Sequence, residues 1–419
     1  MELPRMIRIR QLFEQRSIED LPREVEAQLD RVKLQERIMP GQSVAIACSS
    51  RGIANYADIV RSVVAYLKKL DLDPFIVPAM GSHGSATAAG QKSVLEHLGL
   101  TERRTGAVIR SSLDVTQIGE TDFQLPVYVD KIASEADGIV LINRIKKHTD
   151  YEGEIESGLM KIMAIGLGKQ VGAETYHRAT FAQGYFKVIR SVARTVLQKM
   201  PVLFGLGVIE DSYARTASVH ALLPEEIEER EKDLLEISKK LTPGLPFEDV
   251  DVLIIDEIGK DISGSGFDTK VVGRINLPLL TREPESPRVK RIIACDLTEA
   301  TEGNASGLGN ADFVTQRLMD KTDVYATNMN CLSSCTPEGA KIPPVMKNDR
   351  DAIEMAVQCV GMIPTDKLKI VRIRDTLHLI EVDVSEAYRD ELLLRDDLKI
   401  VKKEKPFVFD GRGNLVPFE

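Results

Sequence analysis

Two histidines and one arginine follow three separate apolar runs, each of which predicts a buried β-strand. The runs and the residues after them are Ser43–Cys48 with Arg51, Pro74–Pro78 with His83, and Gly138–Asn143 with His148. Open parallel sheets bind ligands beyond the carboxyl ends of their strands, so we expect these side chains to converge on one edge. An imidazole with a pKa near ~6.5 can accept and return protons at neutral pH, and a guanidinium can hold a carboxylate or phosphate.

Each of these residues also has a structural interpretation. Arg51 alone could be a surface charge, and a loop histidine is more often solvated or hydrogen-bonded than catalytic. Of the six histidines in the chain, we expect His97, His220 and His378 to be structural. The convergence of the loops, and not any one residue, favours a site.

Lys161 is the one charged residue between Gly158 and Gly168, in a run that is otherwise apolar or glycine. A lysine in such a run either extends to water at a helix edge or is held buried, where its amine becomes nucleophilic. The following Gly166-x-Gly168-Lys169 is predicted to form a turn that could offer backbone N–H groups to a phosphate. The chain has neither a Walker motif nor the G-x-G-x-x-G dinucleotide pattern after a first strand.

Strands alternate with helices along the chain, which predicts an α/β fold with mainly parallel sheets. The first half also predicts a helix capped by Asn55 and running to Lys69, and further helices over 88–98, 181–200 and 222–241. In the second half we expect strands at 250–255 and 289–295, helices at 311–320 and 350–360, and a β-rich end over 368–384.

The length of 419 residues predicts two domains, because single cores rarely grow beyond about 250–300 residues. Thr242-Pro243-Gly244-Leu245-Pro246 is typical of a linker. We therefore predict an N-terminal α/β domain over 1–245 that carries the cofactor and catalytic motifs. A C-terminal α/β domain over 246–419 closes a cleft between the domains, where the active site is expected.

The bulk composition favours a cytoplasmic enzyme over several other classes of protein. The net charge of −9 and the absence of a basic stripe argue against a nucleic-acid partner. No secretory signal or membrane-spanning run is evident. The five cysteines are few, odd in number and scattered, as expected in a reducing compartment, and Cys331 and Cys335 lack the second pair of a metal site.

Taken together, these loops resemble those of the nickel-dependent lactate racemase family. Members carry an Asp-x-Thr-Arg-type loop, a Gly-x-His loop, a His-containing loop leading into a Gly-Gly-x-Lys segment, and a further His. The corresponding pieces here are Cys48–Arg51, Gly81–His83, His148 with Ser157–Lys161, and Glu174–His177. The interval from Lys161 to His177 equals that of the prototype, and the similarity covers roughly residues 43–205.

The resemblance implies a nickel-pincer nucleotide, which is a pyridinium-3,5-bisthiocarboxylic acid mononucleotide with nickel. Lys161 would be joined to it through a thioamide, and His177 would be the protein ligand to nickel, completing the four-coordinate planar site that suits Ni(II). Ser50, Arg51, Gly166 and Gly168 are the other residues expected at the cofactor. Made in an ordinary host, the protein could lack this cofactor.

The implied reaction is racemisation or epimerisation of a 2-hydroxy acid by reversible hydride transfer, with His83 and His148 as the two general bases. Arg51 would hold the substrate carboxylate or the cofactor, and Arg317 and Lys321 are the candidates for a basic substrate-binding residue from the C-terminal domain. The sequence departs from the family at Cys48, Gly52 and Gly84, and the interval from His148 to Lys161 is longer. These departures surround the substrate, so a 2-hydroxy acid other than lactate is an equal expectation.

Two other functions stay open at this point. A zinc- or other metal-dependent hydrolase or lyase would use His83, His148 and His177, although these histidines lack the spacing of clustered metal ligands. A non-catalytic protein that binds the cofactor or a nucleotide would need Lys161 and His177 only. The expected partners are a small 2-hydroxy acid, the cofactor-synthesis enzymes and a second copy of the chain in a homo-oligomer, with no nucleic acid and no membrane.

Overall fold

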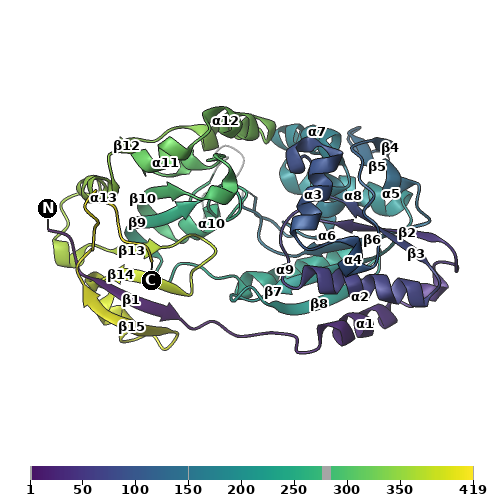
Figure 1. Cartoon of the computed structure of the whole chain (residues 1–419), viewed down its shortest axis with the longest axis horizontal. Coiled ribbons are helices and arrows are strands. Elements are labelled where there is room, and N and C mark those ends of the chain that lie inside the picture. Colours follow the sequence, from purple (N-terminus) through teal and green to yellow (C-terminus); the bar gives the residue numbers. More distant parts are fainter. Residues whose placement is uncertain (1, 150, 276–284, 419) are drawn as a thin grey trace. The chain divides into compact units, whose positions relative to one another are not determined.

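The computed structural model describes every residue of the chain except 1, 150, 276–284 and 419 (Figure 1). The chain forms two compact units. The first unit comprises Glu14–Thr242, and the second comprises Met1–Phe13 together with Pro243–Glu419. Among the described residues, no helix is both long enough and apolar enough to cross a membrane.

The first unit is built on a sheet with the strand order β3-β2-β6-β7-β8. Its strands are β2 (Ser43–Cys48), β3 (Asp73–Pro78), β6 (Gly138–Arg144), β7 (Val202–Glu210) and β8 (Thr216–Leu222). The first four strands are parallel to one another, and β8 is antiparallel to β7. A separate hairpin pairs β4 (Val115–Glu120) with β5 (Pro126–Asp130).

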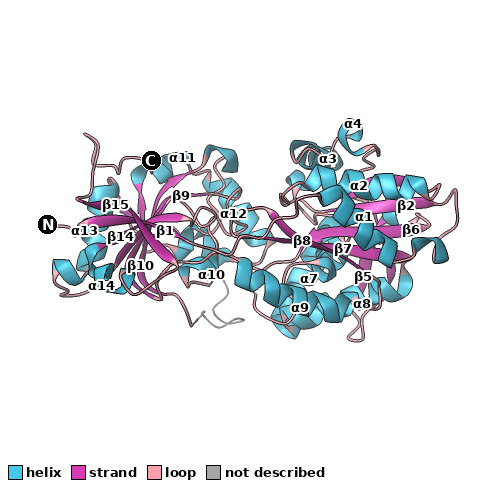
Figure 2. Ribbon diagram, turned by 90° about the horizontal axis from the view of Figure 1, so that it is seen from below, coloured by secondary structure: helices cyan, strands magenta, loops and turns pink. Residues whose placement is uncertain are grey.

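Helices cover both faces of this sheet, as Figure 2 shows. Alternate residues of β2 therefore enter two apolar clusters: Ala45 and Ala47 pack with α8 (Tyr185–Lys199) and α9 (Ile227–Leu241), whereas Ile46 packs with α1 (Leu21–Arg31) and α2 (Tyr56–Lys69). Burial on both faces explains why the parallel strands read as continuous apolar runs. The shorter helices are α3 (Ala88–His97), α4 (Glu102–Thr105) and α5 (Lys131–Ser134).

Three local predictions for the first unit were wrong in detail. The helix predicted over 181–200 is two helices, α7 (Lys169–Gln183) and α8, because Gly184 adopts φ +81° between them. The helix predicted from 222 begins at Ile227, after β8. Asn55 precedes α2 as predicted but does not cap it, since its amide donates to Thr216 Oγ1 at 3.2 Å.

The second unit has a sheet with the order β12-β11-β10-β9-β13-β14-β1-β15. Its strands are β1 (Met6–Gln11), β9 (Asp249–Ile258), β10 (Arg288–Leu297), β11 (Phe313–Thr315), β12 (Val345–Met346), β13 (Ile370–Ile373), β14 (Glu381–Ser385) and β15 (Leu398–Lys405). The part from β12 to β13 is parallel and the remainder antiparallel. Its helices are α10 (Thr269–Val272), α11 (Gln316–Lys321), α12 (Val324–Ser333), α13 (Asp349–Gln358) and α14 (Arg389–Leu392).

The predicted class, two α/β units with mainly parallel sheets flanked by helices, is confirmed. The limits of the units differ from the predicted domains at the N-terminus. Residues 1–13 were assigned to the N-terminal domain, but β1 lies between β14 and β15 in the sheet of the second unit. The buried ion pair of Arg8 with Asp383, 2.7 Å long, joins β1 to β14 there.

Candidate functional site

The loops that hold Arg51, His83 and His148 follow β2, β3 and β6, which are adjacent parallel strands. Cys48, the last residue of β2, is in register with Pro78 of β3 and with Ile142 of β6. All three loops therefore leave the carboxyl edge of the sheet at the same level. This common edge places polar side chains from distant parts of the sequence beside one another.

The loops after β2 and β3 touch through Ser50 and His83. The Ser50 hydroxyl makes a short hydrogen bond with Nδ1 of His83. The hydroxyl can donate or accept, so the bond can form with either tautomer of the imidazole. The contact fixes which way the exposed ring faces. The preceding residue is anchored as well, since the N–H of Ser49 donates to the buried Tyr56 hydroxyl at 2.8 Å. Ser50 thus lies against the side chain predicted to move protons.

A second guanidinium accompanies Arg51 at this edge. Arg144 ends β6 and is ion-paired with Glu210 at the end of β7. Glu210 also accepts the N–H of Ala54 at 2.6 Å, which ties the loop after β2 to this pair. Burial, and then the nearby positive charge of Arg144, lower the pKa of Arg51. The buried Nε of Arg144 has no hydrogen-bond partner among the described residues, so a donor remains for an anion.

His148 is held by an aromatic pair and a buried carboxylate. Its ring centroid lies 5.0 Å from those of Tyr151 and Tyr185, which stack on each other at 3.8 Å. Its backbone N–H donates to Oε2 of the buried Glu156 at 2.7 Å. The Tyr185 hydroxyl donates to the Glu156 carbonyl at 3.3 Å, so the ring pair and the carboxylate belong to one assembly. These contacts limit how far the imidazole can move.

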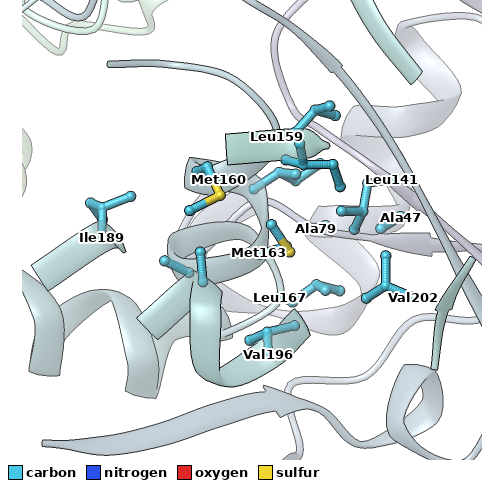
Figure 3. Packing of buried hydrophobic residues seen from close by; sticks show 14 of the residues in the cluster. Ala47, Ala79, Leu141, Leu159, Met160, Met163, Leu167, Ile189, Val196 and Val202 are labelled. Carbon is cyan, nitrogen blue, oxygen red and sulfur yellow. The ribbon is translucent and has the colours of Figure 1, made fainter. Parts of the chain in front are cut away.

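Lys161 ends the one-turn helix α6 (Leu159–Lys161), and a π-helical turn over Ile162–Gly166 follows directly. π-helical turns inside helices often occur at functional sites. Leu159, Met160, Met163 and Leu167 pack into the core against Leu141 and the other residues shown in Figure 3. Lys161 itself is half-buried. The apolar residues of this segment are therefore mostly buried in the core, whereas Lys161 is partly exposed.

We call residues 157–166 the Lys161 segment. This segment is hydrogen-bonded to two of the three loops. The Asn143 amide donates to the Gly158 carbonyl at 2.7 Å, and Lys146 pairs with Ser157 in an antiparallel bridge, which joins the segment to the His148 loop. On the other side, the Gly81 N–H donates to the Gly166 carbonyl at 3.3 Å, which joins it to the His83 loop. The segment therefore connects the two loops that carry the predicted bases.

Glu231 of α9 is a buried carboxylate beneath α6. It accepts the N–H of Met160 at 3.0 Å, and a Cβ at Gly158 would lie only 2.5 Å from it. Burial raises the pKa of Glu231 to about 7, although the N–H groups of Met160 and Leu159 act in the opposite direction. The sequence held a signal for this residue, because Glu231 falls on the apolar stripe of α9 between Ile227 and Leu234.

Leu167 and Gly168 form a turn, as predicted, but it is a tight turn between the π-helical turn and α7. Gly166 ends the π-helical turn, and the Gly168 N–H donates to the Ala164 carbonyl at 3.2 Å, so it is not available to a phosphate. A Cβ at Gly168 would lie 2.5 Å from that same carbonyl, and one at Gly166 would lie 2.7 Å from the Ala79 carbonyl. Close packing of backbone explains both glycines. Lys169, which was expected in the turn, is fully buried.

The remaining predicted residues are placed as follows. His177 is half-buried on α7, and its carbonyl accepts the Thr180 hydroxyl at 2.7 Å. Arg317 and Lys321 belong to α11 of the second unit. Arg317 is ion-paired with the buried Asp349 at 2.9 Å, and Lys321 lies 3.0 Å from Asp296. Both cations of α11 therefore already have acidic partners within their own unit.

The three histidines expected to be structural make local hydrogen bonds. Nδ1 of His97 lies 2.8 Å from the Ser93 carbonyl one turn earlier, and Nε2 of His220 lies 3.0 Å from the Ser218 hydroxyl. Nδ1 of His378 lies 2.7 Å from Asp375, and this hydrogen bond raises the pKa of the imidazole.

The residue types at the edge of the sheet fit the nucleotide that the resemblance implies. The amine of Lys161 and the imidazole of His177 are the two groups that the resemblance implies for covalent attachment and nickel ligation. The unpartnered Nε of Arg144 and the neighbouring Arg51 suit its phosphate or a substrate carboxylate. Within the described part of the chain, no three His, Cys, Asp or Glu side chains form a cluster suited to a metal ion.

Comparison with known proteins supports the family. Residues 7–186 match the model of the lactate racemase N-terminal domain. No curated protein sequence matches the chain significantly. Two solved structures share the fold at 13% identity and a TM-score of 0.54: a protein from Thermotoga maritima and the lactate racemase apoprotein from Thermoanaerobacterium thermosaccharolyticum. The first alignment covers 86% of this chain and 97% of that protein, and the second covers 90% and 99%. Residues 7–186 of this chain are therefore similar to the lactate racemase N-terminal domain, and the chain shares the fold of the lactate racemase apoprotein.

Proposed function

We propose that this chain is a racemase or epimerase of a 2-hydroxy acid that uses a nickel-pincer nucleotide. One structural observation supports the proposal most directly. The Lys161 segment is hydrogen-bonded to the loops that hold His83 and His148, and both loops leave the same edge of the sheet. Two candidate bases and a candidate point of covalent attachment thereby belong to one connected structure.

Lys161 would hold the nucleotide through its amine, and His177 would coordinate the nickel. When bound, the nucleotide supplies a centre that can accept a hydride from carbon and return it. A covalent attachment also holds the reacting groups in a fixed orientation, which lowers the entropy cost of each turnover.

His83 and His148 move the hydroxyl proton of the substrate. When the hydrogen on C2 leaves as hydride, the hydroxyl proton must leave as well, and a neutral imidazole can accept it at neutral pH. Inversion requires a base for either arrangement of the substrate, which is why two histidines on two loops suit the reaction. The hydrogen bond between Ser50 and His83 orients one ring, and the Tyr151–Tyr185 pair orients the ring of His148.

Arg51 and Arg144 bind the carboxylate of the substrate. A guanidinium forms paired, charge-assisted hydrogen bonds with a carboxylate, and the buried Nε of Arg144 is a donor without a partner among the described residues. Because Glu210 neutralises one of these two cations, the pair suits a single carboxylate. Arg317 and Lys321 remain candidates for a further contact with the substrate.

Mass spectrometry of protein made together with the cofactor-synthesis enzymes tests this proposal. We expect added mass on the peptide that contains Lys161, one nickel per loaded chain, and neither in a Lys161→Met variant. A His177→Ala variant should keep the added mass and lose nickel. Nickel-loaded protein with an unmodified Lys161 peptide would contradict the proposed attachment. Cofactor-loaded protein that inverts none of a panel of chiral 2-hydroxy acids would contradict the proposed reaction.

A further inference from the structure

Three polar side chains meet in the core below the His83 loop, and of these the sequence had pointed only to Lys169, as part of a turn. Lys169 begins α7, Asp130 ends β5 and Gln91 lies on α3; all three are fully buried. Nζ of Lys169 lies 2.7 Å from Oδ2 of Asp130, 2.5 Å from the Pro78 carbonyl and 3.2 Å from Oε1 of Gln91. These three acceptors match the three protons of the ammonium group.

The buried ammonium determines how the Gln91 amide is oriented. An ammonium group can only donate, so the oxygen of the amide must face Lys169 and its nitrogen must face away. Nε2 of Gln91 then donates to the carbonyl of Gly81 at 2.8 Å and to that of His83 at 3.3 Å. Both protons of the amide are thus used on the loop that carries a candidate base.

The network connects this loop to the helix that carries His177. Lys169 and His177 both belong to α7, and Lys169 also bonds the Pro78 carbonyl at the end of β3, where the His83 loop begins. A buried charge that loses its partner destabilises a protein strongly, so the loss of any one member of this network should disturb the others.

We propose that Gln91 and Lys169 are positioning residues, which set the backbone of the His83 loop relative to the Lys161 segment and α7. The catalytic consequence rests on the proposed function, whereas the effect on the loop does not. Burial lowers the pKa of Lys169, and the charge of Asp130 acts in the opposite direction and favours the ammonium form. The ammonium form keeps the Gln91 amide in the one orientation that can donate to the loop.

The test uses two variants of Gln91 that preserve its volume. Gln91→Met removes all the hydrogen bonds of the amide. Gln91→Glu keeps an acceptor for Lys169 but has no proton for the Gly81 and His83 carbonyls, because the adjacent cation keeps the carboxylate ionised. Gln358→Met, an exposed position at the end of α13 in the second unit, is the matched control.

The first measurement is made on the intact chain without cofactor. With only six histidines, ring resonances of labelled protein can be followed one by one, and a His83→Gln variant assigns the signal of His83. We expect both Gln91 variants to shift the His83 ring signal and to speed amide exchange over Gly81–Gly84. The signals of His220 and His378 should stay in place. An unchanged His83 signal in folded Gln91→Met, or a loop as protected in Gln91→Glu as in the parent, would overturn the proposal.

The second measurement uses cofactor-loaded protein. We expect kcat to fall by about 10- to 100-fold in both Gln91 variants, as a small displacement of a reacting group can cause, with KM and nickel content unchanged. An equal loss in the Gln358→Met control would overturn the assignment. If the loop depends on Gln91 but the loaded parent inverts no 2-hydroxy acid, the proposed function fails and the positioning role stands.

Discussion

The carboxylate of Glu156 accepts the backbone N–H of His148 at 2.7 Å and lies 3.2 Å from Nζ of Lys239 on α9. This relationship ties a loop at the edge of the sheet to a helix on its face. It also places a fully buried side chain directly behind a candidate base.

Glu156→Leu should lower the free energy of unfolding by about 2 kcal/mol, because the N–H of His148 then loses a charged acceptor inside the protein. Glu154→Leu is the matched control. Glu154 is exposed and pairs with Lys232 at 3.2 Å on the surface, so its loss should cost less than about 1 kcal/mol. Urea unfolding followed by circular dichroism measures both. Equal effects at the two positions would contradict a structural role for Glu156.

Stability should fall as pH rises through the titration of Glu231. In the unfolded chain a glutamate titrates near ~4.3, whereas burial raises the pKa of Glu231 to about 7. The folded state therefore binds the proton more tightly than the unfolded state. Compared with a Glu231→Gln variant, the free energy of unfolding of the parent should not change with pH below about pH 4. It should decrease between about pH 4 and 7. The difference should reach about 4 kcal/mol above pH 7. Unfolding of both proteins at pH 5, 6, 7 and 8 checks this, and a constant difference would contradict the assignment.

Ser50→Ala should lower kcat by about 10-fold without loss of nickel, because it removes the hydrogen bond that orients the His83 ring. Ser50→Thr, which keeps a hydroxyl, should restore most of the rate. Steady-state kinetics and metal analysis of the same samples make the measurement. If the alanine variant instead loses its nickel, the side chain binds the cofactor, as the resemblance implies.

Arg144→Lys should raise KM for a 2-hydroxy acid by about 10-fold, because lysine keeps the charge but lacks the planar fork that binds a carboxylate at two points. Arg61→Lys, on the exposed side of α2, is the control and should leave KM unchanged. Initial-rate kinetics at several substrate concentrations separate KM from kcat. A fall in kcat alone would contradict a role in substrate binding.

The hydrogen on C2 of the substrate should be retained when the loaded enzyme inverts it in deuterated water. A transferred hydride does not exchange with solvent, whereas a proton removed by a base to give a carbanion does. Proton NMR of the recovered acid measures the deuterium at C2. Rapid incorporation of deuterium would contradict hydride transfer.

The alternation of strands and helices and the loops at the strand ends could be predicted from the sequence. β2 is observed at Ser43–Cys48, as predicted, because a strand buried on both faces must be apolar throughout. The proposed roles of Lys161 and His177 come from the resemblance to a family. These roles do not follow from composition or spacing, because a single lysine in an apolar run has several structural explanations.

What could not be predicted depends on contacts between residues that are far apart in the sequence. Nothing local to Glu231 shows that its carboxylate accepts a backbone N–H from Met160, and the network of Lys169 requires three separate elements. The glycines at 166 and 168 suggested a phosphate-binding turn, because close packing of helical backbone and phosphate binding both favour residues without a Cβ. The pattern alone does not distinguish these two causes.

The position of β1 between β14 and β15 makes the first unit an insertion within the second. The polypeptide passes between the units twice, after Phe13 and after Thr242. A ribosome must therefore release almost the entire chain before the opening strand finds both of its neighbours. A fragment that starts at Pro243 would lack β1, so β15 would have no strand to pair with. Such a fragment should be insoluble. A fragment of residues 14–242, in contrast, keeps its own sheet intact.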